Sequence, residues 1–240
     1  MSDFSTLNES CLHKTLKKLY AYENGGKTEV EFFNHIYDIL TEDNEVIEIQ
    51  NRNLYQILPK IKDTLERGIK IRVVYPVVVK KSIELYDKEN NLIKKSNSPV
   101  KGCIYSIFNE IKGIYEVLLN PLFTLEVPFI TITEIREQED SLVQSKNKRR
   151  RFKQDWNKKN KKLNEILSRQ SLKSKEDYLS LIPKGLPEEF NSKDVSQALK
   201  DAKTPAKIYK NPNLILWVLN KMEIIYRSKT EGNRYYYKIR

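Results

Sequence analysis

Hydrophobic residues in the first third of the chain alternate between helical and strand spacing. Leucine and tyrosine recur every three to four positions over 9–23, which predicts an amphipathic helix ended by two glycines. Period-two patterns over 28–50 predict an acidic hairpin continued by a third strand. A helical pattern over 54–65 and a β-branched run over 69–75 follow. They predict a helix that joins two parallel strands in a right-handed crossover.

The next part of the chain is rich in strand patterns. A second hairpin is expected over 79–98, a helix over 105–119 and a long β-like run over 122–135. After this run the apolar periodicity fades. The pattern therefore predicts a first domain over residues 1–140.

Residues 186–240 have the pattern of a small separate domain. Polar caps at Ser192 and Thr204 predict two short helices, and 213–222 predicts a third. Two strands, 224–227 and 234–239, follow. This order resembles a winged helix-turn-helix, a resemblance that implies DNA binding or, in other cases, protein binding.

Charge is distributed unevenly around a net charge of +11. Residues 1–140 hold 18 Lys and Arg against 22 Asp and Glu, whereas residues 141–240 hold 25 against 10. Ten basic residues and only one acid, Asp155, lie within 146–162. We expect 141–185 to be a basic, partly helical linker that attracts nucleic acid, since Lys and Arg displace counterions from phosphates. A solvated, inert linker is the alternative.

Composition predicts a folded protein of the cytoplasm. A chain of 240 residues with 39% hydrophobic residues can bury a core. No apolar stretch is long enough for a membrane span, and the first residues lack the pattern of a signal peptide. Cys11 and Cys103 are expected to be free thiols.

Three polar residues are expected to meet in the acidic hairpin. Glu48 and Gln50 share one face of a strand, and Asp38 enters from the preceding strand. Both acids lie among isoleucines, where a charged group generally requires a partner or a metal ion. Carboxylate oxygens suit Mg²⁺.

This arrangement resembles the active site of the PD-(D/E)XK nuclease superfamily over roughly the first hundred residues. The resemblance implies a restriction-endonuclease-like α/β fold, a mixed β-sheet flanked by helices. It also implies that Asp38, Glu48 and the carbonyl of Ile49 bind Mg²⁺ or Mn²⁺, a metal that supports phosphodiester hydrolysis. Gln50 stands where the common pattern has Lys, although some restriction endonucleases carry Gln there. Gln can orient a water molecule but supplies no charge.

Two further site residues follow from the resemblance. An upstream acid is expected at Glu29 or Glu31, which share a strand face, and Glu29 is preferred. Lys60, on the helix after Gln50, is the candidate for the missing positive charge, since some members carry their Lys there. For His13, on the first helix, a packed or capping role is expected, and an approach to DNA or to the metal site is the alternative.

The leading hypothesis is a Mg²⁺-dependent DNA endonuclease with catalytic residues Glu29, Asp38, Glu48, Gln50 and Lys60. A nuclease-like DNA-binding protein without cleavage and a protein-interaction adaptor are the alternatives. A homodimer is compatible with cutting both strands. The basic residues expected to contact DNA are Lys148, Arg149, Arg150, Arg151, Lys153, Lys203, Lys207, Lys210, Arg227, Lys229 and Arg234.

Overall fold

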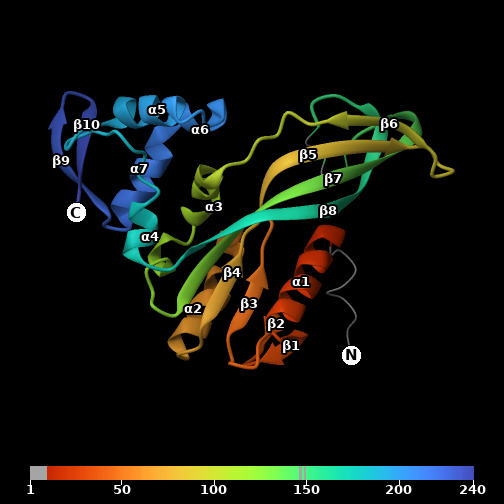
Figure 1. Cartoon of the computed structure of the whole chain (residues 1–240), viewed down its shortest axis with the longest axis horizontal. Coiled ribbons are helices and arrows are strands. Elements are labelled where there is room, and N and C mark those ends of the chain that lie inside the picture. Colours follow the sequence, from red (N-terminus) through yellow and green to blue (C-terminus); the bar gives the residue numbers. More distant parts are fainter. Residues whose placement is uncertain (1–9, 146–147, 149) are drawn as a thin grey trace.

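The computed structural model describes residues 10–145, 148 and 150–240. They form a mixed α/β structure in which helices flank a large mixed sheet (Figure 1). The helical elements are α1 (Cys11–Glu23), η2 (Leu54–Ile57), α2 (Leu58–Glu66), η3 (Ile104–Ile107), α3 (Phe108–Ile111), η4 (Tyr115–Val117), α4 (Lys175–Leu179), α5 (Ser192–Asp201), α6 (Ala206–Tyr209) and α7 (Pro212–Lys221). The strands are β1 (Lys27–Phe32), β2 (His35–Leu40), β3 (Val46–Ile49), β4 (Ile71–Val74), β5 (Val77–Tyr86), β6 (Leu92–Asn97), β7 (Phe123–Val143), β8 (Gln154–Leu172), β9 (Ile225–Glu231) and β10 (Arg234–Ile239). None of the helices in these described ranges is long and apolar enough to cross a membrane.

The large sheet joins an antiparallel meander to parallel strands. Its order is β1-β2-β3-β4-β7-β5-β6, and β8 pairs with β7 outside this path. β1, β2 and β3 are antiparallel neighbours, and α2 carries the chain from β3 to its parallel neighbour β4. The predicted meander and parallel pair are therefore confirmed. β4 and β5 lie along the same edge of β7, and Pro76 separates them.

Helices cover the two faces of this sheet. Leu12, Leu16 and Tyr20 of α1 are buried against one face, where they pack with isoleucines of β2, β3 and β7. Ile61 and Leu65 of α2 belong to the other cluster, which also contains residues of β3 and β4. Both helices follow the spacing read from the sequence, because their buried positions recur every three to four residues.

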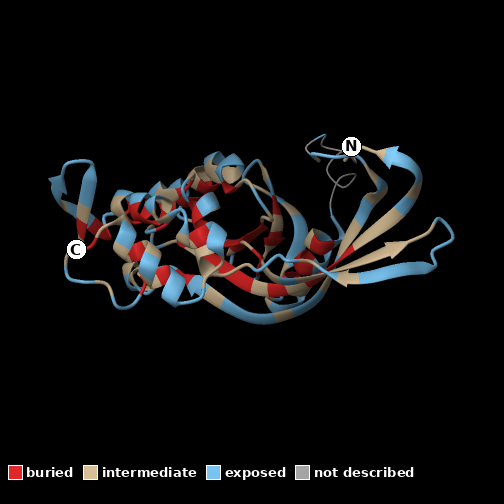
Figure 2. Ribbon diagram, turned by 90° about the horizontal axis from the view of Figure 1, so that it is seen from above, coloured by how far each residue is buried: buried red, intermediate tan, exposed pale blue. Residues whose placement is uncertain are grey.

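The basic segment expected to be a linker is a strand of the main sheet. β8 pairs antiparallel with β7 from Leu125↔Leu172 to Val143↔Gln154. The first domain therefore does not close at residue 140, and 141–185 is not a linker. Exposed lysines conceal the strand pattern, but Leu163 and Ile166 of β8 pack on the α1 side of the sheet. The outer part of the sheet continues beyond α1 (Figures 1 and 2). We call it the arm: it consists of β6, the paired part of β5, and the parts of β7 and β8 nearest their connection.

The helix expected over 105–119 is broken into short turns. Two 3₁₀ segments, η3 and η4, flank the four-residue helix α3. Gly113 lies at the break, where an added Cβ would approach the Cβ of Tyr55 to 2.8 Å. The close approach of η2 therefore interrupts the helix that the apolar spacing alone predicts.

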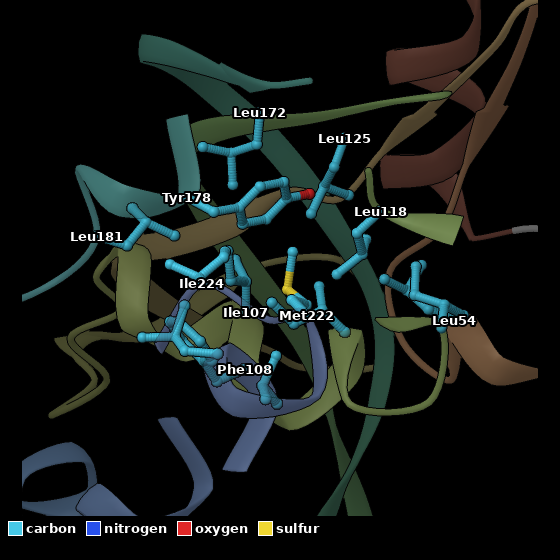
Figure 3. Packing of buried hydrophobic residues seen from close by; sticks show 14 of the residues in the cluster. Leu54, Ile107, Phe108, Leu118, Leu125, Leu172, Tyr178, Leu181, Met222 and Ile224 are labelled. Carbon is cyan, nitrogen blue, oxygen red and sulfur yellow. The ribbon is translucent and has the colours of Figure 1, made fainter. Parts of the chain in front are cut away.

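The C-terminal module, residues 186–240, consists of three helices and a two-stranded antiparallel sheet, β9 and β10. It does not have a core of its own. Met222 and Ile224 belong to the same buried cluster as Phe108 and Leu118 of the body and Tyr178 of α4 (Figure 3). The module and the body are therefore packed into one continuous core.

Candidate active site

A cleft lies between α1, the ends of β2 and β3, and β8. Its volume is about 720 Å³. The residues that line it come from segments far apart in the sequence: Ser10, Leu12, His13, Lys17, Glu29, Ile36, Tyr37, Asp38, Gln50, Asn51, Arg52, Lys158 and Lys161. Acidic groups of the hairpin therefore face basic groups of both α1 and β8.

Asp38 and Glu48 hold β2 and β3 together where the backbone ladder ends. The last ladder pair is Ile39↔Ile47. Beyond it, Asp38 Oδ2 accepts a hydrogen bond from the amide of Ile49 at 2.9 Å, and Glu48 Oε1 accepts one from the amide of Asp38 at 3.1 Å. Each carboxylate thus replaces a missing backbone acceptor, which explains how two acids are tolerated among buried strands.

Lys60 pairs with Glu48 from the following helix. Its Nζ donates to Glu48 Oε1 at 2.5 Å and lies 4.4 Å from the centre of the Tyr37 ring. Burial of Glu48 and the nearby charge of Asp38 raise the pKa of Glu48 to about 6, although Lys60 opposes this shift. The structure therefore brings Lys60 to the acid pair, as the sequence hypothesis required.

Two basic residues of α1 approach Asp38. His13 Nε2 lies 2.7 Å from the carbonyl oxygen of Ile49 and 3.3 Å from Asp38 Oδ2. Lys17 Nζ lies 3.8 Å from Asp38 Oδ1. Burial on its own raises the pKa of Asp38, but the bonds to His13 and the Ile49 amide and the charge of Lys17 outweigh it, so the pKa is lowered. His13 therefore lies at the site, as in the alternative that the sequence left open, rather than in the packed or capping role that was preferred.

Glu29 and Gln50 also face the cleft. Glu29 lies between the paired positions Thr28↔Ile39 and Val30↔Tyr37 of β1 and β2, with a left-handed φ of 55°, and it accepts a hydrogen bond from Lys17 at 2.9 Å. Gln50 follows β3, and its amide donates to the carbonyl of Val74. Glu31, the alternative upstream acid, is exposed outside the cleft lining.

The oxygens expected to bind a metal ion converge only in part. Asp38 Oδ2 and the carbonyl of Ile49 meet around His13 Nε2, and both are hard donors that fit Mg²⁺ or Mn²⁺. Glu48 belongs to the same hydrogen-bonded pair of strands but is engaged by Lys60. Within the described part of the chain, no group of three or more His, Cys, Asp or Glu residues is arranged to hold a metal ion.

The basic side of the cleft was not assigned to the site from the sequence. Lys158 and Lys161 reach it from β8 and Arg52 from the segment after β3. The charge run over 146–162 was the available signal, but Lys158 and Lys161 lie three residues apart and share a face only because of a bulge between them, so period-two spacing does not group them. Only the pairing of β8 with β7 shows which lysines face the acids.

A buried acid fixes the basic groups next to this cleft. Glu134 of β7 is 1% exposed at its side chain and pairs with Lys81 and Lys158 at 3.0 Å each and with Arg136 at 2.7 Å. Burial alone raises the pKa of Glu134, but hydrogen bonds to these three bases lower it from the usual 4.5 to about 2.

We expect Glu134→Gln to destabilise the protein by roughly 2 to 3 kcal/mol at pH 7. The folded-state pKa is below the unfolded value, so this contribution is complete above about pH 4.5 and is lost as the pH falls towards 2. Urea unfolding of the unmodified protein and of Glu134→Gln between pH 7 and 2.5 measures the difference in their free energies of unfolding. A difference in free energy of unfolding that does not shrink with acid would contradict the prediction.

The other predicted DNA contacts lie at both ends of the molecule. Lys148, Arg150, Arg151 and Lys153 lie in or beside the connection between β7 and β8, and Arg149 lies outside the described residues. Lys203, Lys207, Lys210, Arg227, Lys229 and Arg234 belong to the C-terminal module at the opposite end from the arm (Figure 1). Of these, Lys229 is paired with both Glu189 and Glu231.

The third helix of the module is partly used for internal packing. α7 packs against α3 and η4 of the body, and Trp217 contacts Tyr115 edge-on, with ring centres 5.6 Å apart. Ile215, Leu216 and Leu219 are buried in the shared core. Contacts from this module to a nucleic acid would therefore come from its exposed basic residues.

The fold and cleft define a mixed α/β protein with an acid pair at the junction of antiparallel and parallel strands. A family model described as "Domain of unknown function (DUF8091)" matches residues 10–173, so the chain belongs to this family. The matched segment begins just before α1 and ends just after β8, and it contains the whole cleft lining. Comparison with curated proteins and with solved structures found no match.

Proposed function

We propose that the protein is a Mg²⁺- or Mn²⁺-dependent DNA endonuclease of the PD-(D/E)XK type. The observation that carries this proposal is the position of Asp38 and Glu48, each of which accepts a hydrogen bond from a backbone amide of the other's strand. Lys60 binds Glu48, and basic side chains line the opposite side of the cleft. Hydrolysis of a phosphodiester in DNA uses both the acidic and the basic groups, because anionic oxygens hold the metal cation and basic side chains attract the phosphates.

Asp38, Glu48 and the Ile49 carbonyl would hold the metal ion, which when bound polarises a phosphate oxygen and supports formation of the nucleophile. Gln50 faces the same cleft and would orient the attacking water. Lys60 balances the charge of Glu48, and Glu29, which lines the same cleft as Asp38, would complete the acidic side. Glu29, Asp38 and Gln50 line the cleft, and Glu48 and Lys60 are connected to Asp38 by hydrogen bonds.

The C-terminal module would assist as a winged helix. Its helix order and terminal hairpin support this proposal, and exposed Lys203, Lys207, Arg227 and Arg234 would contact phosphates. Because α7 packs on the body, the module would be held in a fixed position relative to the cleft.

Incubation of the purified protein with plasmid, linear, branched and single-stranded DNA tests the proposed activity. We expect cutting with Mg²⁺ or Mn²⁺ and none with a chelator. Addition of excess metal to the chelated sample should restore cutting. Intact DNA of every kind, with both metals, would overturn the proposal.

Binding of DNA without cleavage is the second candidate function. It is favoured by the position of His13 and Lys17, which engage the Asp38 and Ile49 oxygens expected to hold the metal ion, and by Gln50 in place of Lys. Under this reading the carboxylates serve only to hold β2 to β3. DNA binding that is unchanged by metal, with no cleavage, would identify it.

A further inference from the structure

The strongest unexplained feature is one face of the arm. Cross-strand partners share a face of a sheet, and the pairs Ile132↔Leu163, Glu134↔Lys161, Arg136↔Lys158 and Gln138↔Trp156 follow one another along β7 and β8. Ile132 and Leu163 pack in the α1 cluster. The same face therefore continues outward from the α1 side of the sheet, where no described helix covers it (Figures 1 and 2).

This face carries a concentrated positive charge. Lys81, Arg136, Lys158 and Lys161 surround a single acid, Glu134. Lys161 forms no ion pair with any described residue. Its burial and the charge of Lys158 lower its pKa, and Glu134 only partly opposes the effect. The excess of positive charge is thus greatest beside the cleft, where a polyanion would compensate it.

An arginine–tryptophan stack marks the outer end of the face. The guanidinium carbons of Arg136 and Arg150 lie 3.6 and 4.0 Å from the centre of the Trp156 ring. Arg150 also donates hydrogen bonds to the carbonyls of Val143 and Trp156. Trp156 is therefore engaged by cations rather than open for base stacking, and it holds two guanidinium groups at the outer end of this face, of which that of Arg136 also binds Glu134.

We propose that this face of the arm, from Lys161 to Trp156, binds the phosphate backbone of double-stranded DNA that extends outward from the cleft. Cleavage of the bound DNA in the cleft rests on the proposed function, whereas binding of DNA by the arm does not. Lys161 and Trp156 pair with Glu134 and Gln138, which lie four residues apart on β7, so the two positions are about 13 Å apart, which corresponds to about four base pairs. A duplex is favoured over a single strand because the ring of Trp156 already stacks with arginines.

Adjacent lysines on opposite faces of β8 provide the test. Lys161 lines the cleft, whereas Lys162 pairs with Thr133 on the other face and is exposed. We measure binding of a labelled 20-base-pair duplex by fluorescence anisotropy, with EDTA present so that cleavage cannot occur. Lys161→Glu should weaken binding at least tenfold near 100 mM salt and reduce the salt slope by about 1 or more, as expected for loss of a phosphate contact. Lys162→Glu should change affinity less than threefold.

Arg150→Ala provides a second, independent variant at the outer end, and thermal unfolding checks that all variants fold. Equal losses for Lys161→Glu and Lys162→Glu, or no loss for Lys161→Glu, would overturn the proposal. Preferential loss of single-stranded DNA or of RNA binding would also overturn it, because the occupant would then be different. If the protein never cuts DNA but Lys161→Glu selectively weakens duplex binding, the result would support DNA binding by the arm and refute only the proposed nuclease activity.

Discussion

Asp38→Asn should reduce metal-dependent DNA cleavage by at least about 10³-fold and leave DNA affinity within about threefold of the unmodified protein. Removal of a metal-binding carboxylate withdraws several kcal/mol of transition-state stabilisation, and about 4 kcal/mol corresponds to this loss. Asn is the informative replacement, because its side-chain oxygen can still accept the hydrogen bond from the Ile49 amide that Asp38 accepts at 2.9 Å. Ala would instead leave that amide without its acceptor.

Glu31→Gln is the matched control for this experiment. It removes one negative charge from the neighbouring strand β1, at an exposed position outside the cleft lining. Cleavage rates under single-turnover conditions and anisotropy with EDTA separate the loss of chemistry from the loss of binding. Full activity of Asp38→Asn would refute the proposed centre. An equal loss in Glu31→Gln would show that the acids act only through the overall charge.

Local patterns were sufficient for the elements around the acid pair. The helical spacing of α1 and α2 and the period-two spacing of β2 and β3 are short-range signals, and the structure has these elements at the expected positions. Asp38, Glu48 and Lys60 come together because each lies close in sequence to a strongly patterned element. Their contacts span only 10 to 12 residues of sequence.

The basic side of the cleft depended on long-range pairing that no local pattern specifies. Lys158 and Lys161 line the same cleft as Asp38 and Gln50 only because β8 adds to β7 in one register, and a shift of one residue would turn them to the opposite face. Bulges in the β7–β8 pair further disturb the alternation. The role of His13 has the same origin, since its contact with Ile49 crosses 36 residues.

Phe108→Ala should destabilise the whole protein by about 3 to 5 kcal/mol, the usual cost of removing a buried phenylalanine. Phe108 has no exposed surface and belongs to the cluster that joins the body to the C-terminal module (Figure 3). Phe152→Ala is the matched control, because Phe152 is 64% exposed and its loss should cost less than about 0.5 kcal/mol. Denaturant unfolding gives both values.

The same variant tests whether the molecule unfolds as one unit. Trp217 lies on α7 and contacts Tyr115 of the body, so its fluorescence, measured in proteins that also carry Trp156→Phe, reports the contact between module and body, whereas far-ultraviolet circular dichroism reports the whole chain. If one core holds both parts, Phe108→Ala shifts the two signals together to lower denaturant. Separate transitions, with only one of them shifted, would show that residues 186–240 fold independently. In that case the module's position relative to the cleft would not be fixed, and its DNA contacts would have to be considered separately from those of the arm.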